Sequence, residues 1–174
     1  MAPGSGLAPK PFVLTAEIDG ESFGRLNELR RRYYPPERNL VPAHLTLFHQ
    51  LPGERSREIK AYLRAVAGEH APIDVQSAEW KVMERGVALF VRSPQLNALR
   101  DRLAREWWPW LTGQDRAGFG PHVTIQNNVP AAEARRTQLE VAATARLSSL
   151  RAVGLHLWRY RDGPWDDVQL FRFR

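Results

Sequence analysis

Two short stretches, HLTLF at residues 44–48 and HVTIQ at residues 122–126, repeat one pattern in two separate parts of the chain. The chain has 174 residues and only five histidines, so chance predicts far fewer than one His-x-Thr pair, and there are two. In both stretches apolar residues alternate with the polar ones, as in a strand that has one face against a core. The stretches therefore predict two half-buried strands that carry the same polar pair, one in each half of the chain.

Side chains two residues apart on a strand point to the same face. His44 and Thr46 are therefore expected to project together, and so are His122 and Thr124, with the intervening apolar residues turned into the core. If the two strands face one cleft, two imidazoles and two hydroxyls meet there.

This set of groups suits the chemistry of phosphodiesters. Cleavage of a P–O bond needs a base to activate the attacking oxygen and an acid to protonate the departing one, and histidine does both near neutral pH. Threonine hydroxyls can donate hydrogen bonds to the non-bridging phosphate oxygens. Two histidines without nearby carboxylates or cysteines do not specify a zinc site. The sequence thus favours a metal-independent site, and we expect no cofactor.

The rest of the chain predicts strands and helices in an order that repeats. We expect an α+β protein of two pseudo-symmetric lobes, with mainly antiparallel sheets flanked by helices and a central cleft that carries both motifs. Residues 1–10 are expected to form a flexible tail and residues 11–174 a single bilobal domain. The expected elements are a strand over 12–19, helices near 23–33, 59–68, 94–107 and 130–145, the two motif strands, a strand pair over 72–92 and a C-terminal hairpin over 152–173.

Composition narrows the class of protein. A hydrophobic share of 43% and a charged share of 25% are typical of a globular domain, and the absence of cysteine excludes disulfides and thiol nucleophiles. The chain has no apolar run long enough for a bilayer, and its start, MAPGSGLAPKP, lacks a signal core, which favours the cytoplasm. The net charge of +6 comes mostly from arginine, which favours a phosphate-binding surface or, equally, the scattered arginines of a GC-rich genome.

With these motifs the chain resembles the two-histidine phosphoesterases of the 2′-5′ RNA ligase family. The motifs read AHLTLF and PHVTIQ, and four longer stretches are similar to one bacterial branch of the family: RNLVPAHLTLFHQLPG, GVALFVRSPQLNALRDRLA, QDRAGFGPHVTIQNNV and GLHLWRYRDGPW. The resemblance implies a two-lobed fold whose cleft is lined by both motifs. It also implies action on 2′-5′ phosphodiester bonds or nucleoside 2′,3′-cyclic phosphates, commonly without metal.

By motif position, the resemblance gives His44 and His122 the acid–base roles and has Thr46 and Thr124 bind the phosphate. The sequence leaves open which histidine is the base, although we favour His122. The expected partner is RNA or a nucleotide with a cyclic or 2′-5′ phosphodiester. We expect a monomer with no obligate protein partner and no membrane association.

Further residues are candidates for binding the substrate. Relatives often carry a basic residue near the second motif, but this chain has uncharged residues there, so the phosphate cation is sought elsewhere. The candidates are Arg38 and Arg116 as cations, Phe48 and Phe119 as stacking residues next to the motifs, and Trp158 and Tyr160 as stacking residues that share a strand face with His156. That strand face fits packing of the sheet against a helix equally well, and we favour packing.

Two other functions are compatible with the same residues. One is a non-catalytic module that binds RNA or a nucleotide, and the other is a phosphodiesterase of the cyclic ADP-ribose-phosphate type. Acid–base catalysis predicts a bell-shaped pH profile, whereas pure binding predicts a dependence on salt concentration. The third class differs from the first by its substrates alone.

Overall fold

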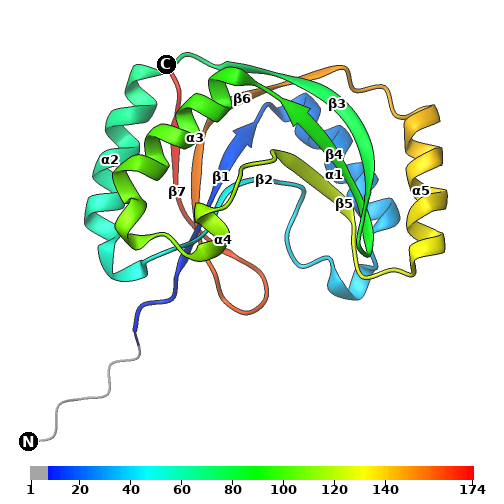
Figure 1. Cartoon of the computed structure of the whole chain (residues 1–174), viewed down its shortest axis with the longest axis horizontal. Helices are drawn as coiled ribbons and strands as arrows, with labels where there is room; N and C mark the ends of the chain where they lie inside the picture. The colour runs from blue at the N-terminus through cyan, green and yellow to red at the C-terminus, as the bar shows by residue number, and fades with distance from the viewer. Residues whose placement is uncertain (1–7) are drawn as a thin grey trace, which may run out of the picture.

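The computed structural model describes residues 8–174 as an arched sheet with helices on its outer side (Figure 1). Residues 1–7 of the predicted tail lie outside the described residues. Within the described part, no helix has the length and apolar character needed to cross a membrane. Residues 8–10 lead into the first strand and are exposed.

All the strands join one antiparallel sheet, which confirms the predicted fold class. The sheet has seven strands in the order β1-β2-β5-β4-β3-β6-β7, and β1 also pairs with β6, so the arch closes through β6. The long β6 pairs first with β3 and then with β7. The strands are β1 (Phe12–Ile18), β2 (Leu45–Leu51), β3 (Ile73–Met83), β4 (Gly86–Arg92), β5 (His122–Gln126), β6 (Ser149–Arg159) and β7 (Asp166–Arg172).

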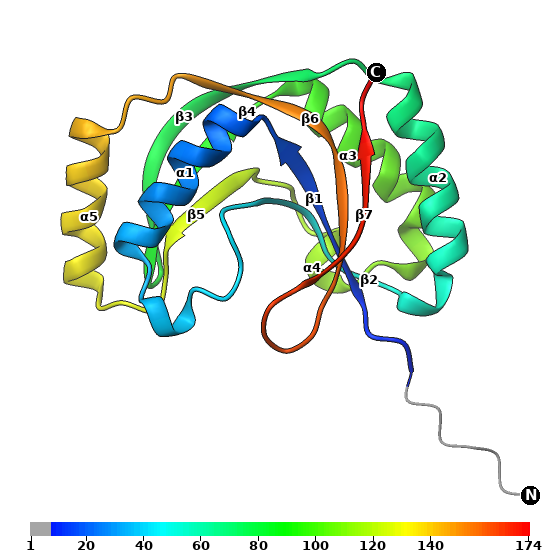
Figure 2. The ribbon, with the colours of Figure 1, turned by 180° about the vertical axis from the view of Figure 1, so that it is seen from behind.

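The helices cover the sheet from outside, two at each end of the arch (Figures 1 and 2). Helices α2 and α3 lie at one end, α1 and α5 at the other, and short helices occupy the connections. Each half of the chain covers the other: α1 packs on β5, while Trp107 of α3 packs on Phe48 of β2. The bounds are α1 (Gly20–Tyr33), η1 (Pro36–Arg38), η2 (Gly53–Arg55), α2 (Ser56–Glu69), α3 (Pro94–Trp107), η3 (Trp108–Trp110), α4 (Gly113–Arg116) and α5 (Ala131–Thr144).

Sequence signals account for the helix that precedes the second motif. Ser93 caps α3 by accepting a hydrogen bond from the backbone N–H of Leu96, and Pro94 occupies its first turn. The apolar stripe of α3 is buried and ends at Trp107, whose ring meets those of Phe48 and Tyr62 edge-on. Burial of these large rings anchors the lobe that contains the first motif strand.

A β-bulge changes which residues of β2 face the cleft. Thr15 pairs with Thr46, but Leu14 pairs with Phe48, so Leu47 is the extra residue on β2. Both Leu47 and Phe48 are consequently buried. Strict alternation places Phe48 beside the first motif as a stacking candidate. The bulge instead turns it into the core, where it cannot stack on a ligand.

A buried carboxylate ties α4 to the end of β2. Asp115 is 1% exposed and accepts hydrogen bonds from the backbone N–H groups of His49 and Gln50, each at 2.9 Å. Its Oδ1 also lies 3.1 Å from Nδ1 of His49. Burial would raise the pKa of this carboxyl, but the hydrogen bonds from His49 and Gln50 outweigh that effect and hold the pKa below its usual value.

We expect Asp115→Asn to lower the free energy of unfolding by about 2 kcal/mol, because its amide group cannot accept two of these backbone hydrogen bonds. Urea denaturation at neutral pH measures the change. The matched control is Asp101→Asn on the exposed side of α3, which should change the unfolding free energy by less than about 0.5 kcal/mol. Equal stability of the two variants would contradict a structural role for Asp115.

Candidate functional site

The sheet brings the two motifs together at the centre of the arch. Strands β2 and β5 pair at one position, Leu45 with Val123. Residues that flank such a pair in antiparallel strands also lie opposite each other, on the other face of the sheet. Each motif histidine therefore lies beside the threonine of the other motif, and all four polar side chains are on the face away from the core.

Both motif imidazoles are held in the same way. Nδ1 of His44 lies 2.8 Å from the carbonyl oxygen of Pro42, and Nδ1 of His122 lies 2.8 Å from that of Gly120. A carbonyl only accepts hydrogen bonds, so Nδ1 carries the proton in each ring. In the neutral imidazole Nε2 is then unprotonated and can exchange a proton with a ligand.

The surroundings of the two rings differ. The His122 ring stacks on Phe90 of β4, with centroids 5.0 Å apart, whereas the His44 ring meets Trp165 at 4.7 Å. The Lys81 ammonium lies 4.8 Å from the centroid of the Phe90 ring. A cation that the sequence did not indicate thus lies on the side of the second motif.

The surroundings of His44 shift its protonation equilibrium. Burial lowers its pKa from 6.5 to about 4, and the positive charge of Arg30 and interactions with His122 and His49 act in the same direction. The hydrogen bond to the carbonyl of Pro42 opposes the change only in part. The His44 imidazole is therefore neutral at pH 7.

Helix α1 holds both motifs from beneath. Arg30 is 3% exposed and donates from Nη1 to the carbonyl oxygen of Thr124 at 2.8 Å and from Nε to Asn39 Oδ1 at 2.9 Å. One turn earlier, Asn27 Oδ1 accepts the backbone N–H of Ala43, the residue before the first histidine, at 3.0 Å. In the described part of the chain Arg30 forms no ion pair with a carboxylate, so it brings a buried positive charge to the site.

Helix α3 makes the corresponding contact to the first motif strand. Buried Arg100 donates from Nε to the carbonyl oxygen of Leu47 at 3.2 Å and from Nη2 to that of Asp115. Its guanidinium lies 4.1 Å from the centroid of the Phe48 ring. Each half of the chain thus sends a buried arginine to the motif strand of the other half.

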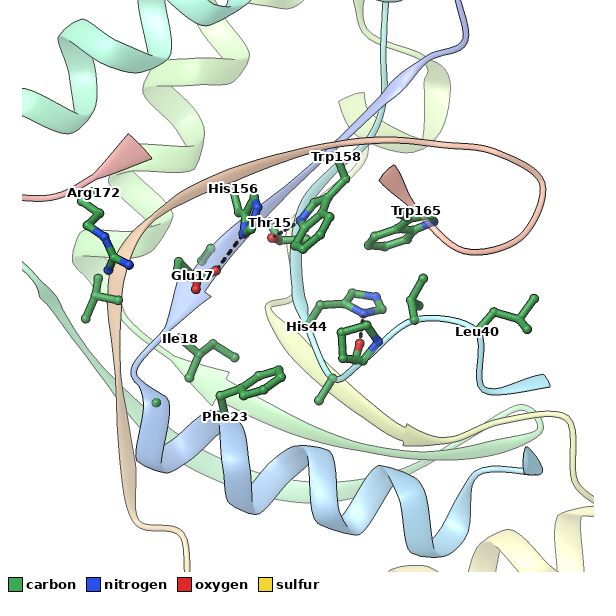
Figure 3. Close-up of a pocket in the computed structure, with 16 residues that line it drawn as sticks. Thr15, Glu17, Ile18, Phe23, Leu40, His44, His156, Trp158, Trp165 and Arg172 are labelled. Atoms are coloured by element: carbon green, nitrogen blue, oxygen red, sulfur yellow. Dashed lines mark hydrogen bonds and ion pairs between the residues drawn. The ribbon is translucent and has the colours of Figure 1, made fainter. Parts of the chain in front are cut away.

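A pocket of about 410 Å³ opens beside His44 (Figure 3). Trp158 of β6 and Trp165 of the β6–β7 connection form one wall, and Phe23 of α1 lies on the opposite side. Away from His44 the pocket is lined by Glu17, His156 and Arg172 among others. This size and aromatic lining are typical of a site for a small organic ligand.

His156 anchors the wall of this pocket. Its Nδ1 lies 3.0 Å from Glu17 Oε2 and its Nε2 lies 3.1 Å from Asp167 Oδ1, so the residue connects β1, β6 and β7. Burial lowers the pKa of His156, but Glu17 and Asp167 outweigh it and raise the pKa above its usual value. The ring also stacks on Trp158 at 3.7 Å, and Trp158 donates to Thr15 Oγ1 at 3.0 Å. His156 thus packs against charged partners and a pocket wall, in place of the helix expected from its strand face.

Of the predicted substrate-binding residues, only Trp158 lines the pocket beside His44. Arg116 and Phe119 line a different, smaller hollow, where Arg116 donates to the carbonyl oxygen of Trp108 at 3.1 Å. Tyr160 follows β6, is 39% exposed and lies outside the pocket lining.

The cation candidates do not reach the pocket either. Arg38, at the end of η1, is exposed and is not among the residues that line the pocket. The structure instead brings Arg30 to the Thr124 carbonyl of β5 and Lys81 to the Phe90 ring on which His122 stacks. Sequence reasoning missed both because neither is near a motif in the chain, although Arg30 does follow buried Leu26 at helical spacing.

Glu17, Trp165 and Arg172 are among the pocket residues that the sequence did not single out. Thr15 and Glu17 are two residues apart on β1 and line the same pocket, a spacing equal to that of the motifs. Trp165 follows a turn in which Asp162 has a positive φ of 56°. The spacing on β1 was the available signal, whereas the position of Trp165 depends on tertiary structure.

Comparisons with known proteins agree with this fold. A family model described as the 2′-5′ RNA ligase superfamily matches residues 18–164. Comparison with curated proteins gave no match. Among solved structures, TT0787 of Thermus thermophilus has a similar fold, with a TM-score of 0.60, 18% identity and coverage of 94% of this chain and 98% of that one. E. coli LigT is also similar in its complexes with NADP+ (TM-score 0.57, 20% identity) and 3′-AMP (TM-score 0.59, 19% identity), each covering 95% of this chain and 98% of LigT.

We expect the His44 ring to titrate near pH 4 in an NMR titration, where its signal is identified by its loss in a His44→Gln variant. The unfolded chain takes up this proton near pH 6.5, so the contribution of neutral His44 to stability is present above pH 6.5 and is lost as the pH falls towards 4. Between pH 7 and pH 5 the wild type should therefore lose on the order of 2 kcal/mol more unfolding free energy than the variant. Equal losses would contradict the lowered pKa.

Proposed function

Because the chain belongs to the 2′-5′ RNA ligase superfamily, we propose that it is a metal-independent phosphoesterase acting on nucleoside 2′,3′-cyclic phosphates or 2′-5′ phosphodiester bonds derived from RNA. The family predicted from the two motifs is confirmed, and membership itself supports a function of the two-histidine phosphoesterase or ligase type. The bacterial branch, the cytoplasmic location and the monomeric state stay predictions.

One observation carries the proposal: two imidazoles with fixed Nδ1 protons and available Nε2 atoms lie on one sheet face, each beside the threonine of the other motif. In hydrolysis of a cyclic phosphate, one Nε2 takes a proton from water as the water oxygen bonds to phosphorus. The other imidazole, protonated, gives its proton to the ribose oxygen as the P–O bond breaks. The two imidazoles then return to their starting states by proton exchange with solvent.

The negative charge that develops on phosphate needs hydrogen-bond donors and cations. The hydroxyls of Thr46 and Thr124 lie on the same face as the imidazoles and supply the donors. Arg30 contributes its charge from beneath β5, and Lys81 lies beside the ring on which His122 stacks. These residues support the part of the proposal that requires no metal ion.

The acid and base roles follow from the surroundings of the two rings. Because burial lowers the pKa of His44 to about 4, this imidazole is unprotonated in the free protein at neutral pH. We therefore assign the base to His44 and the acid to His122, which reverses the assignment that the sequence favoured. The pH dependence of catalysis distinguishes the two assignments.

The pocket beside His44 supports a nucleotide as the substrate. Its volume of about 410 Å³ is within the range of small-ligand sites, and the rings of Trp158 and Trp165 offer surfaces on which a base can stack. The same pocket distinguishes a nucleotide substrate from a small phosphodiester without a base, which would leave these aromatic surfaces unused.

We expect His44→Ala and His122→Ala each to reduce the hydrolysis of nucleoside 2′,3′-cyclic phosphates by about 10²- to 10⁴-fold, because each removes an acid–base group. The assay contains excess EDTA, and wild-type activity should persist in it. Substrates with a 2′-5′ linkage are tested in parallel.

The control for these substitutions is His70→Ala, since His70 follows α2 and does not line the pocket. It should keep most of the activity, and circular dichroism checks that all variants are folded. Full activity in either motif variant would exclude the two-histidine mechanism. Loss of wild-type activity in EDTA would exclude metal independence.

We expect the acid limb of the pH profile of kcat/KM to lie well below pH 6.5, because kcat/KM reports the free enzyme and an unprotonated base is required. Activity should therefore rise as the pH increases through about 4 and should fall again when the acid loses its proton. Measurement from pH 4 to pH 9 tests this expectation. An acid limb at or above pH 6.5 would contradict a base whose pKa is lowered, and with it the assignment of the base to His44.

A further inference from the structure

The part of the pocket away from His44 contains polar groups that acid–base chemistry does not use. Glu17 of β1 and Arg172 of β7 both line it. Glu17 is 33% exposed at its side chain, and within residues 8–174 the guanidinium of Arg172 has no hydrogen-bond or ion-pair partner. The pocket therefore presents one carboxylate, which only accepts hydrogen bonds, and one guanidinium, which only donates them.

The carboxylate is held in place by a network that leaves it capacity for a ligand. His156 binds Glu17 Oε2 through Nδ1 and Asp167 through Nε2, so both of its nitrogens are occupied. His156 therefore has no free ring nitrogen with which to form a hydrogen bond to a ligand. Glu17 Oε1 has no partner in the described residues, and Figure 3 shows the carboxylate at the pocket surface beside His156. The network thus fixes an acceptor whose free oxygen can receive donors from a bound molecule.

Aromatic rings on both sides of this polar end determine the shape of the group that fits. The Trp158 ring is fixed by its stacking on His156 and its hydrogen bond to Thr15. Phe23 lies across the pocket from it, with Glu17 between them along the wall (Figure 3). A flat ring system that enters between Trp158 and Phe23 directs its edge towards Glu17 and Arg172.

We propose that this end of the pocket binds guanine, so that the substrate is a guanosine nucleotide whose phosphodiester lies at His44. The inference rests on the proposed function, because it places the phosphate between the two motifs. Guanine has adjacent donors at N1 and N2, which match a carboxylate, and adjacent acceptors at O6 and N7, which match a guanidinium. Each of the two unused groups therefore obtains a two-point contact with the same base.

The other bases satisfy these groups less well. Adenine and cytosine each carry one exocyclic amino group, so they offer the carboxylate a single donor site and the guanidinium fewer acceptors. Uracil presents a single N–H between two carbonyl oxygens, and one of these oxygens would face the carboxylate. A base that leaves the Glu17 carboxylate or the Arg172 guanidinium without a matching partner loses the corresponding contact and binds less well.

The first experiment changes the substrate and not the protein. We expect guanosine 2′,3′-cyclic phosphate to have a kcat/KM about tenfold or more above that of inosine 2′,3′-cyclic phosphate, which lacks only the N2 amino group. The adenosine and uridine substrates should be poorer still. Equal kcat/KM values for the guanosine and inosine substrates would overturn the assignment of guanine.

The second experiment changes the carboxylate. Glu17→Gln keeps an oxygen that can accept from His156, so the fold should persist, but it should remove most of the preference for guanosine over adenosine. Arg172→Met should lower kcat/KM for guanosine and inosine substrates by a similar factor, since both bases retain O6 and N7. The matched control, Glu28→Gln, lies on the exposed side of α1 and should leave the preference unchanged. A preference that survives Glu17→Gln would overturn the role of Glu17.

Binding measurements separate this inference from the proposed function. Quenching of tryptophan fluorescence by 3′-GMP, 3′-AMP and 3′-UMP reports base selectivity without turnover. Turnover without a preference for guanosine overturns the inference and leaves the proposed function in place. Selective binding of 3′-GMP without turnover of any cyclic or 2′-5′ substrate supports the inference and overturns the function. If the protein shows neither base selectivity nor turnover, both the inference and the proposed function are overturned.

Discussion

The hydrogen bond from Arg30 to the carbonyl oxygen of Thr124 marks the constraint on which the site depends. Strands β2 and β5 share a single paired position, so backbone groups beyond it lose their partners in the sheet. A buried carbonyl group that accepts no hydrogen bond destabilises the fold, so a donor from outside the sheet is needed. Helix α1 does so with Arg30, and helix α3 does the same for β2 with Arg100. Strands β2 and β5 can therefore diverge on either side of their single pair, where both motifs lie, without leaving these carbonyl groups unpaired.

The use of an arginine as the donor to this carbonyl also determines the electrostatics of the cleft. A guanidinium matches the backbone carbonyl and stays charged, and Arg30 has no carboxylate beside it in the described part of the chain. Its charge helps to keep the His44 imidazole neutral and favours an anion in the cleft. An amide side chain such as glutamine could satisfy the carbonyl but would supply no charge. The same residue thus joins the two lobes and supplies positive charge that the proposed phosphate substrate requires.

The sequence was sufficient for the order of the elements and for the shared facing of the histidine and threonine in each motif, because both depend on local periodicity. The prediction that Phe48 faces the site was wrong because it assumed strict alternation along β2. The bulge at Leu47 adds one residue to β2, and no local sequence pattern reveals it. Arg30 and Glu17 were missed because charged residues are usually exposed, and their partners lie far away in the chain. Pairing between distant strands decides what surrounds a motif. A single sequence lacks that register, so it predicts which motif side chains share a face better than it predicts the residues around them.

The two halves repeat the same motif, yet an acid and a base must differ. The imidazole orientation is the same in both, since each Nδ1 is held 2.8 Å from a backbone carbonyl two residues earlier. The difference comes from what covers the rings. His44 borders a deep pocket closed by Trp165 from the β6–β7 connection, whereas His122 stacks on Phe90, near the ammonium of Lys81. The β6–β7 connection (residues 160–165) corresponds in element order to the shorter β3–β4 turn (residues 84–85), so the two halves differ in the length of this connection. Trp165 of this longer connection covers the His44 ring and adds to the burial that lowers the pKa of His44. The proposed base and acid roles depend on such a difference between the surroundings of two similarly held imidazoles.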